Sequence, residues 1–146
     1  MSIAIPEAVK TEVQQAYSQY LNSKEYRARY GQRLMIAEIV KGLMTTEEQG
    51  PAISVVEAGT GTGKTIAYLL AALPVAKHLG KRLVVSTATV ALQEQIVLKD
   101  LPDLAEHSGM AFNFELVKGR GRYLCLSKLD MLLSNHESQN PNQALY

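Results

Sequence analysis

A glycine-rich octapeptide, AGTGTGKT at residues 58–65, limits the possible folds of this chain. It follows a short β-branched run and precedes an apolar stretch with helical spacing. Closely spaced glycines let the backbone wrap around an anion and point its N–H groups inward. The start of the following helix also favours negative charge. A tight glycine turn with a surface lysine is the alternative, but motif and context agree on a phosphate-binding loop.

The residue types of this loop indicate a nucleoside triphosphate bound with Mg²⁺, and ATP is the expected nucleotide. Lys64 would place its charge on the β- and γ-phosphates, and the Thr65 hydroxyl would ligate Mg²⁺. These two are the candidate catalytic residues, and Thr65 is the candidate magnesium ligand. The predicted phosphate-binding residues are Gly59, Thr60, Gly61, Thr62, Gly63, Lys64 and Thr65.

Helix-like and strand-like segments alternate along the chain. Apolar spacing predicts helices over residues 6–21, 32–44, 64–79, 89–101 and 123–133, and strands over residues 53–57, 83–86 and 112–117. The alternation favours an α/β P-loop NTPase (RecA-like) fold, a three-layer parallel sheet with flanking helices. Only three strands are visible, so we expect a truncated sheet in the first piece of a larger domain.

Local signals refine these boundaries. Pro74 is expected to kink or shorten its helix, and Gly80 to cap it. Pro102 should end the helix before it, and residues 134–143 look like a loop. We predict two parts, N-terminal helices at residues 1–50 and the first part of an ATP-binding domain at residues 51–146, divided at Gly50-Pro51.

Composition adds limits on partners and compartment. The net charge of +1 does not indicate a nucleic-acid partner, so any basic surface must be local. One cysteine allows no disulfide framework within the chain and fits a reducing compartment. We see no signal peptide and no apolar stretch long enough to span a bilayer. A cytoplasmic location without membrane contact is expected.

Four blocks, in order, resemble the DinG and XPD helicases of superfamily 2. YRARYGQR at 26–33 resembles the family's Q motif, and VEAGTGTGKT at 56–65 its motif I, which begins with alanine. VVSTATVALQEQ at 84–95, continued by KDLP at 99–102, resembles motif Ia. KGRGRYLC at 118–125 resembles the approach to an iron–sulfur cluster. The resemblance spans residues 26–129 and implies the N-terminal part of a DinG-like ATP-dependent DNA helicase.

By this resemblance, Gln32 reads the edge of the adenine. A carboxamide offers the donor and the acceptor that adenine requires. Arg29 and Tyr26 are the expected neighbours that position or stack on the base. The alternative is that Gln32 only caps the following helix.

Motif Ia is expected to contact the backbone of single-stranded DNA. The candidate residues are Ser86, Thr87, Thr89 and Gln93, which offer polar groups beside a helix N-terminus. The alternative for Ser86 and Thr89 is helix capping alone.

A basic cluster separated by glycines is the second candidate DNA contact. Arg120 and Arg122, with Lys118 and Tyr123 nearby, suit a nucleic-acid backbone and one stacked base. A solvated turn is the alternative.

Cys125 would be the first ligand of a [4Fe–4S] cluster by resemblance. Such a cluster needs about four thiolates, and this chain has one cysteine. The cluster therefore cannot assemble from this chain alone. Either further cysteines lie beyond Tyr146, or this homologue lacks the cluster and Cys125 packs as a small apolar residue.

Residues that would use bound ATP are not evident. Glu57 immediately precedes the loop, and neither Asp100 nor Asp103 follows an apolar strand as a Walker B carboxylate would. We expect this chain alone to bind ATP weakly and to hydrolyse it negligibly, with helicase activity residing in a longer protein. The alternatives are a non-catalytic nucleotide- or DNA-binding module and another P-loop NTPase. The sequence predicts no oligomeric state.

Overall fold

The computed structural model describes residues 5–45 and 53–139, and it divides into two units, Met1–Phe114 and Glu115–Tyr146. The predicted boundary at Gly50-Pro51 lies outside the described residues.

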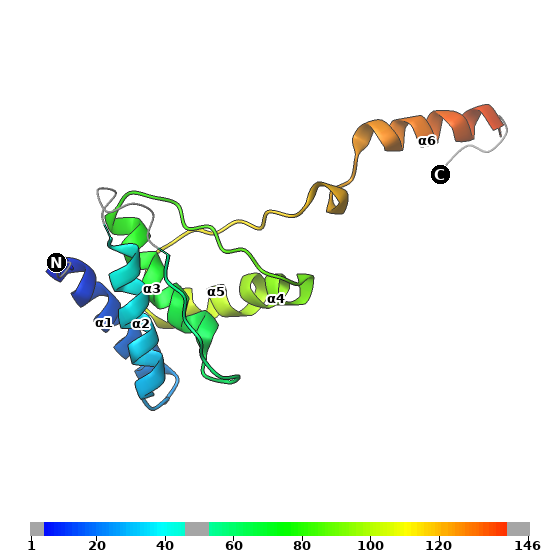
Figure 1. Ribbon diagram of the computed structural model, residues 1–146. Helices are drawn as coiled ribbons and strands as arrows, with labels where there is room; N and C mark the ends of the chain where they lie inside the picture. The colour runs from blue at the N-terminus through cyan, green and yellow to red at the C-terminus, as the bar shows by residue number, and fades with distance from the viewer. Residues whose placement is uncertain (1–4, 46–52, 140–146) are drawn as a thin grey trace. The chain divides into compact units, whose positions relative to one another are not determined.

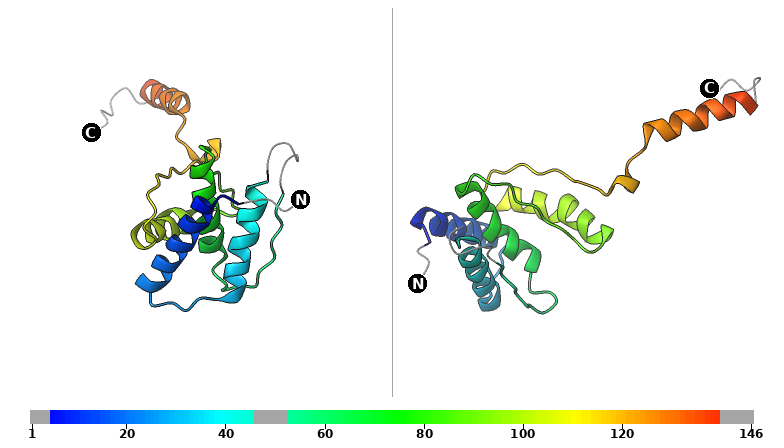
Figure 2. Two further views of the ribbon diagram at one scale, coloured as in Figure 1. Left: turned by 90° about the vertical axis from the view of Figure 1, so that its left-hand side faces the viewer. Right: turned by 45° about the horizontal axis from the view of Figure 1, so that its top comes forward.

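Three helices form the centre of the first unit (Figures 1 and 2). They are α1 (Glu7–Ser23), α2 (Tyr30–Leu43) and α3 (Lys64–His78). The helix α3 packs against both α1 and α2, and its Leu69 and Leu70 are completely buried. The three predicted helices are confirmed, with ends that differ from prediction by one or two residues.

The end of α3 matches one prediction and corrects another. Gly80 has φ +61° and donates its N–H to the Lys77 carbonyl at 3.1 Å, while Lys81 donates to the Ala76 carbonyl at 2.8 Å. This Schellman arrangement confirms the predicted glycine cap. Pro74 does not shorten the helix, which continues to His78. Pro74 is fully buried, so its packing offsets the one hydrogen bond that proline cannot donate.

The helix predicted to end before Pro102 is longer than expected. It runs as α4 (Val90–Gln95), a π-helical turn η2 (Ile96–Asp100) and α5 (Leu101–His107) without interruption. The π turn changes the hydrogen-bonding register just before the proline, whose missing N–H then lies in the first turn of α5. Leu104 is completely buried, and α5 contacts α1. Tertiary packing therefore continues the helix past a local stop signal.

No strand is present within residues 5–45 and 53–139. The three segments predicted as strands are irregular, and their apolar side chains are largely exposed, including Ile53, Val55 and Val84. A strand satisfies its backbone groups only through a neighbouring strand, and none of these segments pairs with another. The structure does not confirm the predicted parallel sheet.

The second unit contains a 3-10 turn, η3 (Arg120–Arg122), and the helix α6 (Leu126–Gln139). The helix starts three residues after the predicted start and continues through part of the predicted loop. Leu129 donates its N–H to the Cys125 carbonyl at 3.0 Å, which begins the helical hydrogen-bond ladder. Ser134, predicted to open the loop, instead bonds the Asp130 carbonyl through its hydroxyl at 2.9 Å. Residues 140–143 of that predicted loop lie outside the described part of the chain.

Candidate nucleotide site

The glycine-rich loop leads directly into α3, as the sequence predicts. Gly61 and Gly63 have φ +74° and +75°, a conformation that favours glycine, and Gly63 is the residue just before the helix. The Thr62 hydroxyl donates to the Gly59 carbonyl at 2.8 Å, and this bond closes a turn within the loop. The loop therefore presents its backbone beside a helix N-terminus, the arrangement that binds anions.

Lys64 turns its side chain back over the loop. Its Nζ donates to the Ala58 carbonyl at 2.9 Å and to the Gly59 carbonyl at 2.8 Å. An ammonium group has three donors, and two of them are used here by weak, neutral acceptors. A phosphate oxygen would be a stronger acceptor for the same charge. The Lys64 ammonium already lies against the backbone of the loop that would hold the phosphates.

Thr65 and Tyr68 form a pair on the first turn of α3. Burial raises the pKa of the Tyr68 phenol, and a hydrogen bond with the Thr65 side chain partly offsets that increase. Tyr68 contacts the candidate magnesium ligand, and sequence reasoning missed it. The signal that could have found it is its position, three residues after Thr65 on a predicted helix.

Two of the three predicted base-binding residues meet the loop itself. Arg29 donates from its guanidinium to the Gly61 carbonyl at 2.8 Å, and the Gln32 amide nitrogen donates to the Gly63 carbonyl at 3.3 Å. Gln32 lies in the first turn of α2, which shows no side-chain cap, so the capping alternative is wrong. Tyr26 instead packs edge-on against Tyr20, with ring centroids 6.4 Å apart.

Gln32 has a second partner that the sequence did not indicate. The Tyr17 hydroxyl of α1 donates to the Gln32 side-chain oxygen at 3.1 Å. Tyr17 lies within the helix that apolar periodicity predicts over residues 6–21, and its ring is buried. The hydroxyl nevertheless reaches the candidate nucleotide site, which periodicity could not reveal.

The motif Ia residues adopt a helix-start geometry. The Thr89 hydroxyl accepts the Leu92 N–H at 3.2 Å, which confirms that Thr89 caps α4. The Thr87 hydroxyl donates to the Thr89 carbonyl at 3.1 Å. Ser86 is exposed and precedes the cap by three residues, so its capping alternative is wrong. Gln93 lies on the first turn of α4 and is partly buried.

The basic cluster of the second unit is a solvent-facing turn. Arg120 and Arg122 are exposed on η3, and the Lys118 N–H donates to the Tyr123 phenol oxygen at 2.8 Å. That bond closes the turn that carries the two arginines. The geometry is compatible with the solvated-turn alternative and with a backbone contact to nucleic acid.

Cys125 is an exposed free thiol. Across the described residues, no group of three or more His, Cys, Asp or Glu side chains is arranged to hold a metal ion. A single thiolate cannot supply the donor set of a [4Fe–4S] cluster, so the residues of this chain do not fit that cofactor.

Asp103 and Asp100 have structural partners. Asp103 accepts a hydrogen bond from the Tyr20 hydroxyl at 2.8 Å and pairs with the Lys24 ammonium at 2.5 Å. Burial alone would raise the pKa of Asp103, but the bonds from Lys24 and Tyr20 leave it below its usual value. Burial and the same hydrogen bond raise the pKa of Tyr20. Asp100 is buried and accepts from Gln95 at 3.1 Å.

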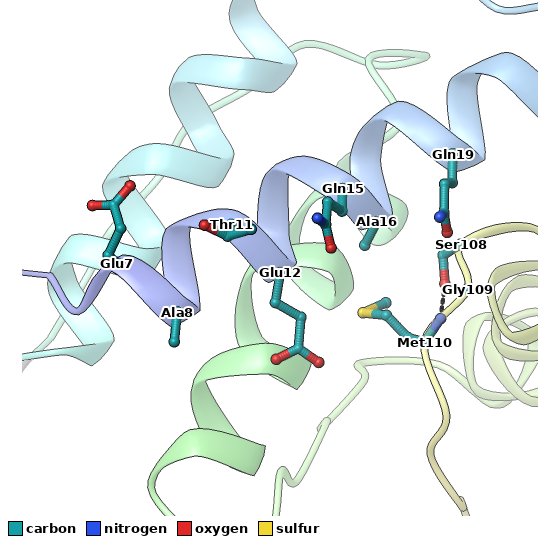
Figure 3. Close-up of a pocket in the computed structure, with 10 residues that line it drawn as sticks. All are labelled: Glu7, Ala8, Thr11, Glu12, Gln15, Ala16, Gln19, Ser108, Gly109 and Met110. Carbon is teal, nitrogen blue, oxygen red and sulfur yellow. Dashed lines mark hydrogen bonds between the residues drawn. The ribbon is translucent and has the colours of Figure 1, made fainter.

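A cavity of about 480 Å³ lies between α1 and the turn after α5 (Figure 3). It contains none of the predicted site residues. Its lining residues are Glu7, Ala8, Thr11, Glu12, Gln15, Ala16, Gln19, Ser108, Gly109 and Met110. The part of the chain that the structure describes contains no helix with the length and apolarity needed to span a membrane.

Comparison with known proteins shows the family of this chain. The family model described as DEAD/DEAH box helicase matches residues 29–139. The chain is 41% identical over 132 residues to the ATP-dependent DNA helicase DinG of Photobacterium profundum, covering 90% of this chain and 19% of that protein. It is 39% identical over 138 residues to the Escherichia coli ATP-dependent DNA helicase DinG, covering 94% and 19%. For the Mycobacterium tuberculosis ATP-dependent helicase DinG, identity is 41% over 124 residues, covering 81% and 18%. The chain thus spans about a fifth of the length of these relatives.

Proposed function

Because the chain belongs to the DEAD/DEAH box helicase family, we propose that it supplies the nucleotide-binding part of an ATP-dependent DNA helicase. The family carries a P-loop NTPase fold, and the resemblance to DinG helicases predicted from four sequence blocks is confirmed by the relatives. One observation carries the proposal: Lys64, Arg29 and Gln32 all bond the backbone of the same glycine-rich loop. The proposal includes a cytoplasmic location.

The proposed nucleotide lies along this loop. Its phosphates meet the backbone of residues 59–65, and the Lys64 ammonium exchanges carbonyl partners for phosphate oxygens. The Thr65 hydroxyl would hold Mg²⁺, which would supply positive charge to the phosphates. Gln32 faces the base, with Arg29 at the same loop and Tyr26 as the proposed stacking residue.

The proposed sheet uses the three irregular segments. In the longer protein, residues 53–57, 83–86 and 112–117 become parallel strands of a RecA-like, three-layer arrangement with helices on both faces. Their β-branched and aromatic composition supports this reading. Parallel strands are normally buried on both faces, so a sheet would cover the apolar side chains that these segments expose. The close approach of α2 to the first of these segments supports the proposal further. A Cβ atom added at Gly42 would lie 2.9 Å from Ser54 Cβ, so the helix already lies directly against residues 53–57.

Single-stranded DNA is the proposed partner. Thr87, Thr89 and Gln93, with Ser86 before them, would contact its phosphates at the start of α4. The Thr89 cap supports this reading because it fixes the first turn. Arg120 and Arg122 would add charge, and both are exposed on η3.

Nucleotide binding is tested by calorimetric titration of the chain with ATP and Mg²⁺. Lys64→Ala should weaken ATP binding by about 10- to 100-fold, because charge-assisted hydrogen bonds are lost. Lys77→Ala is the matched control, because Lys77 lies on the last turn of α3 and pairs with Glu12. Equal affinities for the wild-type and Lys64→Ala chains would contradict the proposal. We expect negligible ATP hydrolysis by this chain.

DNA binding is tested by fluorescence anisotropy with a labelled oligothymidine across a salt series. Replacing both Arg120 and Arg122 by Gln should weaken binding and reduce the slope of log K against log salt by about 0.7 per arginine. Lys128→Gln on α6 controls for a general loss of charge. A slope that the double variant leaves unchanged would remove these arginines from the proposed interface.

A further inference from the structure

Three polar groups form a connected path from α1 to the glycine-rich loop. Tyr17 of α1 donates its hydroxyl hydrogen to the side-chain oxygen of Gln32 at 3.1 Å. The Gln32 side-chain nitrogen donates in turn to the Gly63 carbonyl at 3.3 Å. The path joins residues that lie 15 and then 31 positions apart in sequence. Gln32 is thus held from both ends of its carboxamide.

The chemistry of the two ends fixes which way the carboxamide faces. The Gly63 carbonyl can only accept, so it requires the amide nitrogen. The opposite end then presents the oxygen, and Tyr17 must donate to it. Reversing the amide would bring two oxygens together at Gly63. The arrangement uses one of two N–H groups and one of two lone pairs on Gln32.

Glycine at position 63 permits this close approach. A Cβ atom at Gly63 would lie 2.7 Å from the Gln32 side-chain nitrogen. The same glycine has φ +75° and directly precedes α3. The Gln32 carboxamide therefore packs directly against the backbone that would hold the phosphates.

We propose that Tyr17 is a positioning residue for nucleotide recognition. By holding the Gln32 carboxamide in one orientation, Tyr17 leaves the remaining N–H and lone pair of Gln32 available for the edge of the base. Without the hydroxyl, the Gln32 oxygen loses a partner and the side chain samples other rotamers. This inference rests on the proposed function above and adds a residue of α1, which precedes the family match at residue 29.

Tyr20 provides an internal comparison. It lies three residues later on α1 and is similarly buried, but its hydroxyl donates to Asp103 of α5. Tyr17→Phe and Tyr20→Phe remove the same atom from neighbouring turns of one helix. Only the first change reaches Gln32.

The test compares ATP with inorganic tripolyphosphate, which lacks the base, by calorimetric titration of the chain. Tyr17→Phe should weaken ATP binding by about 5- to 10-fold and change tripolyphosphate binding by less than twofold, since one hydrogen bond is removed. Tyr20→Phe should change neither. In a Gln32→Ala background, Tyr17→Phe should have no further effect, because a residue acting through Gln32 has nothing left to position.

Two failures are distinguishable. A wild-type chain that does not bind ATP overturns the proposed function and the role of Tyr17 in base recognition with it. A Tyr17→Phe chain that binds ATP as tightly as wild type, or that weakens ATP and tripolyphosphate equally, overturns the inference about Tyr17 alone.

A nucleotide-free measurement tests the positioning directly. The Gln32 side-chain NH₂ resonances, assigned by their loss in Gln32→Ala, should shift in Tyr17→Phe and stay in place in Tyr20→Phe. Gln32 resonances that Tyr17→Phe leaves unchanged would overturn the inference whether or not ATP binds.

Discussion

The helices of the first unit and the irregular segments between them differ sharply in burial. Leu69, Leu70 and Leu104 on α3 and α5 are completely buried, whereas Val55 and Val84 are 90% and 86% exposed. Both kinds of segment are apolar. A helix satisfies its backbone within itself and needs only one packed face, whereas a strand needs neighbours for its backbone and for both faces. Helices from this stretch of chain therefore build a core that its strand candidates do not.

The candidate site follows the same division. Arg29, Gln32 and Lys64 lie at the starts of α2 and α3, and the packing of these helices brings them to one loop. The motif Ia residues follow an irregular segment, and the Thr87 and Thr89 side chains bond backbone groups of residues 89 and 92. Helix packing therefore brings the residues of the loop together, whereas local hydrogen bonds shape the start of α4.

The largest expected effect comes from the helical core. Leu70→Ala should lower the free energy of unfolding by about 3 kcal/mol, because it removes buried methyl groups and leaves a cavity. Urea unfolding followed by circular dichroism measures the change. A loss below about 1 kcal/mol would show that α3 is not the centre of a packed core.

The next effect concerns the loop that joins the two kinds of segment. Gly63→Ala should cost about 2 kcal/mol, because alanine is strained at positive φ and its Cβ meets Gln32. Gly59→Ala is the control for stability, since no atom lies within 4 Å of its added Cβ and its φ is not positive. Equal unfolding curves for the two variants would contradict this geometry.

A smaller effect is expected where α5 is tied to α1. Asp103→Asn should destabilise the chain by about 1 kcal/mol at pH 7, because the Tyr20 hydroxyl loses a charged acceptor. The folded-state pKa of Asp103 is lowered, so its contribution is present above the unfolded value of about 3.9 and is lost as pH falls through the folded value.

The stability difference between wild type and Asp103→Asn should therefore shrink between about pH 5 and pH 3. Urea unfolding at several pH values measures it, and Asp130→Asn on α6 is the control. The pKa of Tyr20 is raised, so its contribution is present below an unfolded value of about 10 and falls at higher pH. A stability difference that stays constant across the acid range would show that the Asp103 carboxylate does not stabilise the contact between α1 and α5.

The smallest effect is expected in an irregular segment. Val55→Ala should change the free energy of unfolding by less than about 0.5 kcal/mol, because the side chain is already exposed. Val75→Ala is the matched control, because Val75 is 2% exposed on α3. This change should lower the free energy of unfolding by about 2 kcal/mol. A cost at Val55 equal to that at Val75 would break the comparison and indicate that residues 53–57 pack as a strand.

Sequence reasoning predicted the helices and the loop well because their signals are local. Helical spacing located α1, α2 and α3, Gly80 marked the end of α3, and Thr89 marked the start of α4. It failed at Pro102, where a π turn and the burial of Leu104 override a local stop. The predicted strands are not confirmed, because β-branched and aromatic composition indicates a tendency that only a paired neighbour can realise.

By itself, the sequence determined the phosphate loop, the family and the helices that flank the loop, because each depends on residues within a few positions of one another. Only the tertiary structure decided the partners of buried polar groups. The Tyr20 hydroxyl meets Asp103 across 83 positions, and Tyr17 reaches Gly63 through Gln32. Apolar periodicity identifies which face of a helix is buried, but it does not identify the group at which a buried hydroxyl points. That choice depends on how distant helices pack.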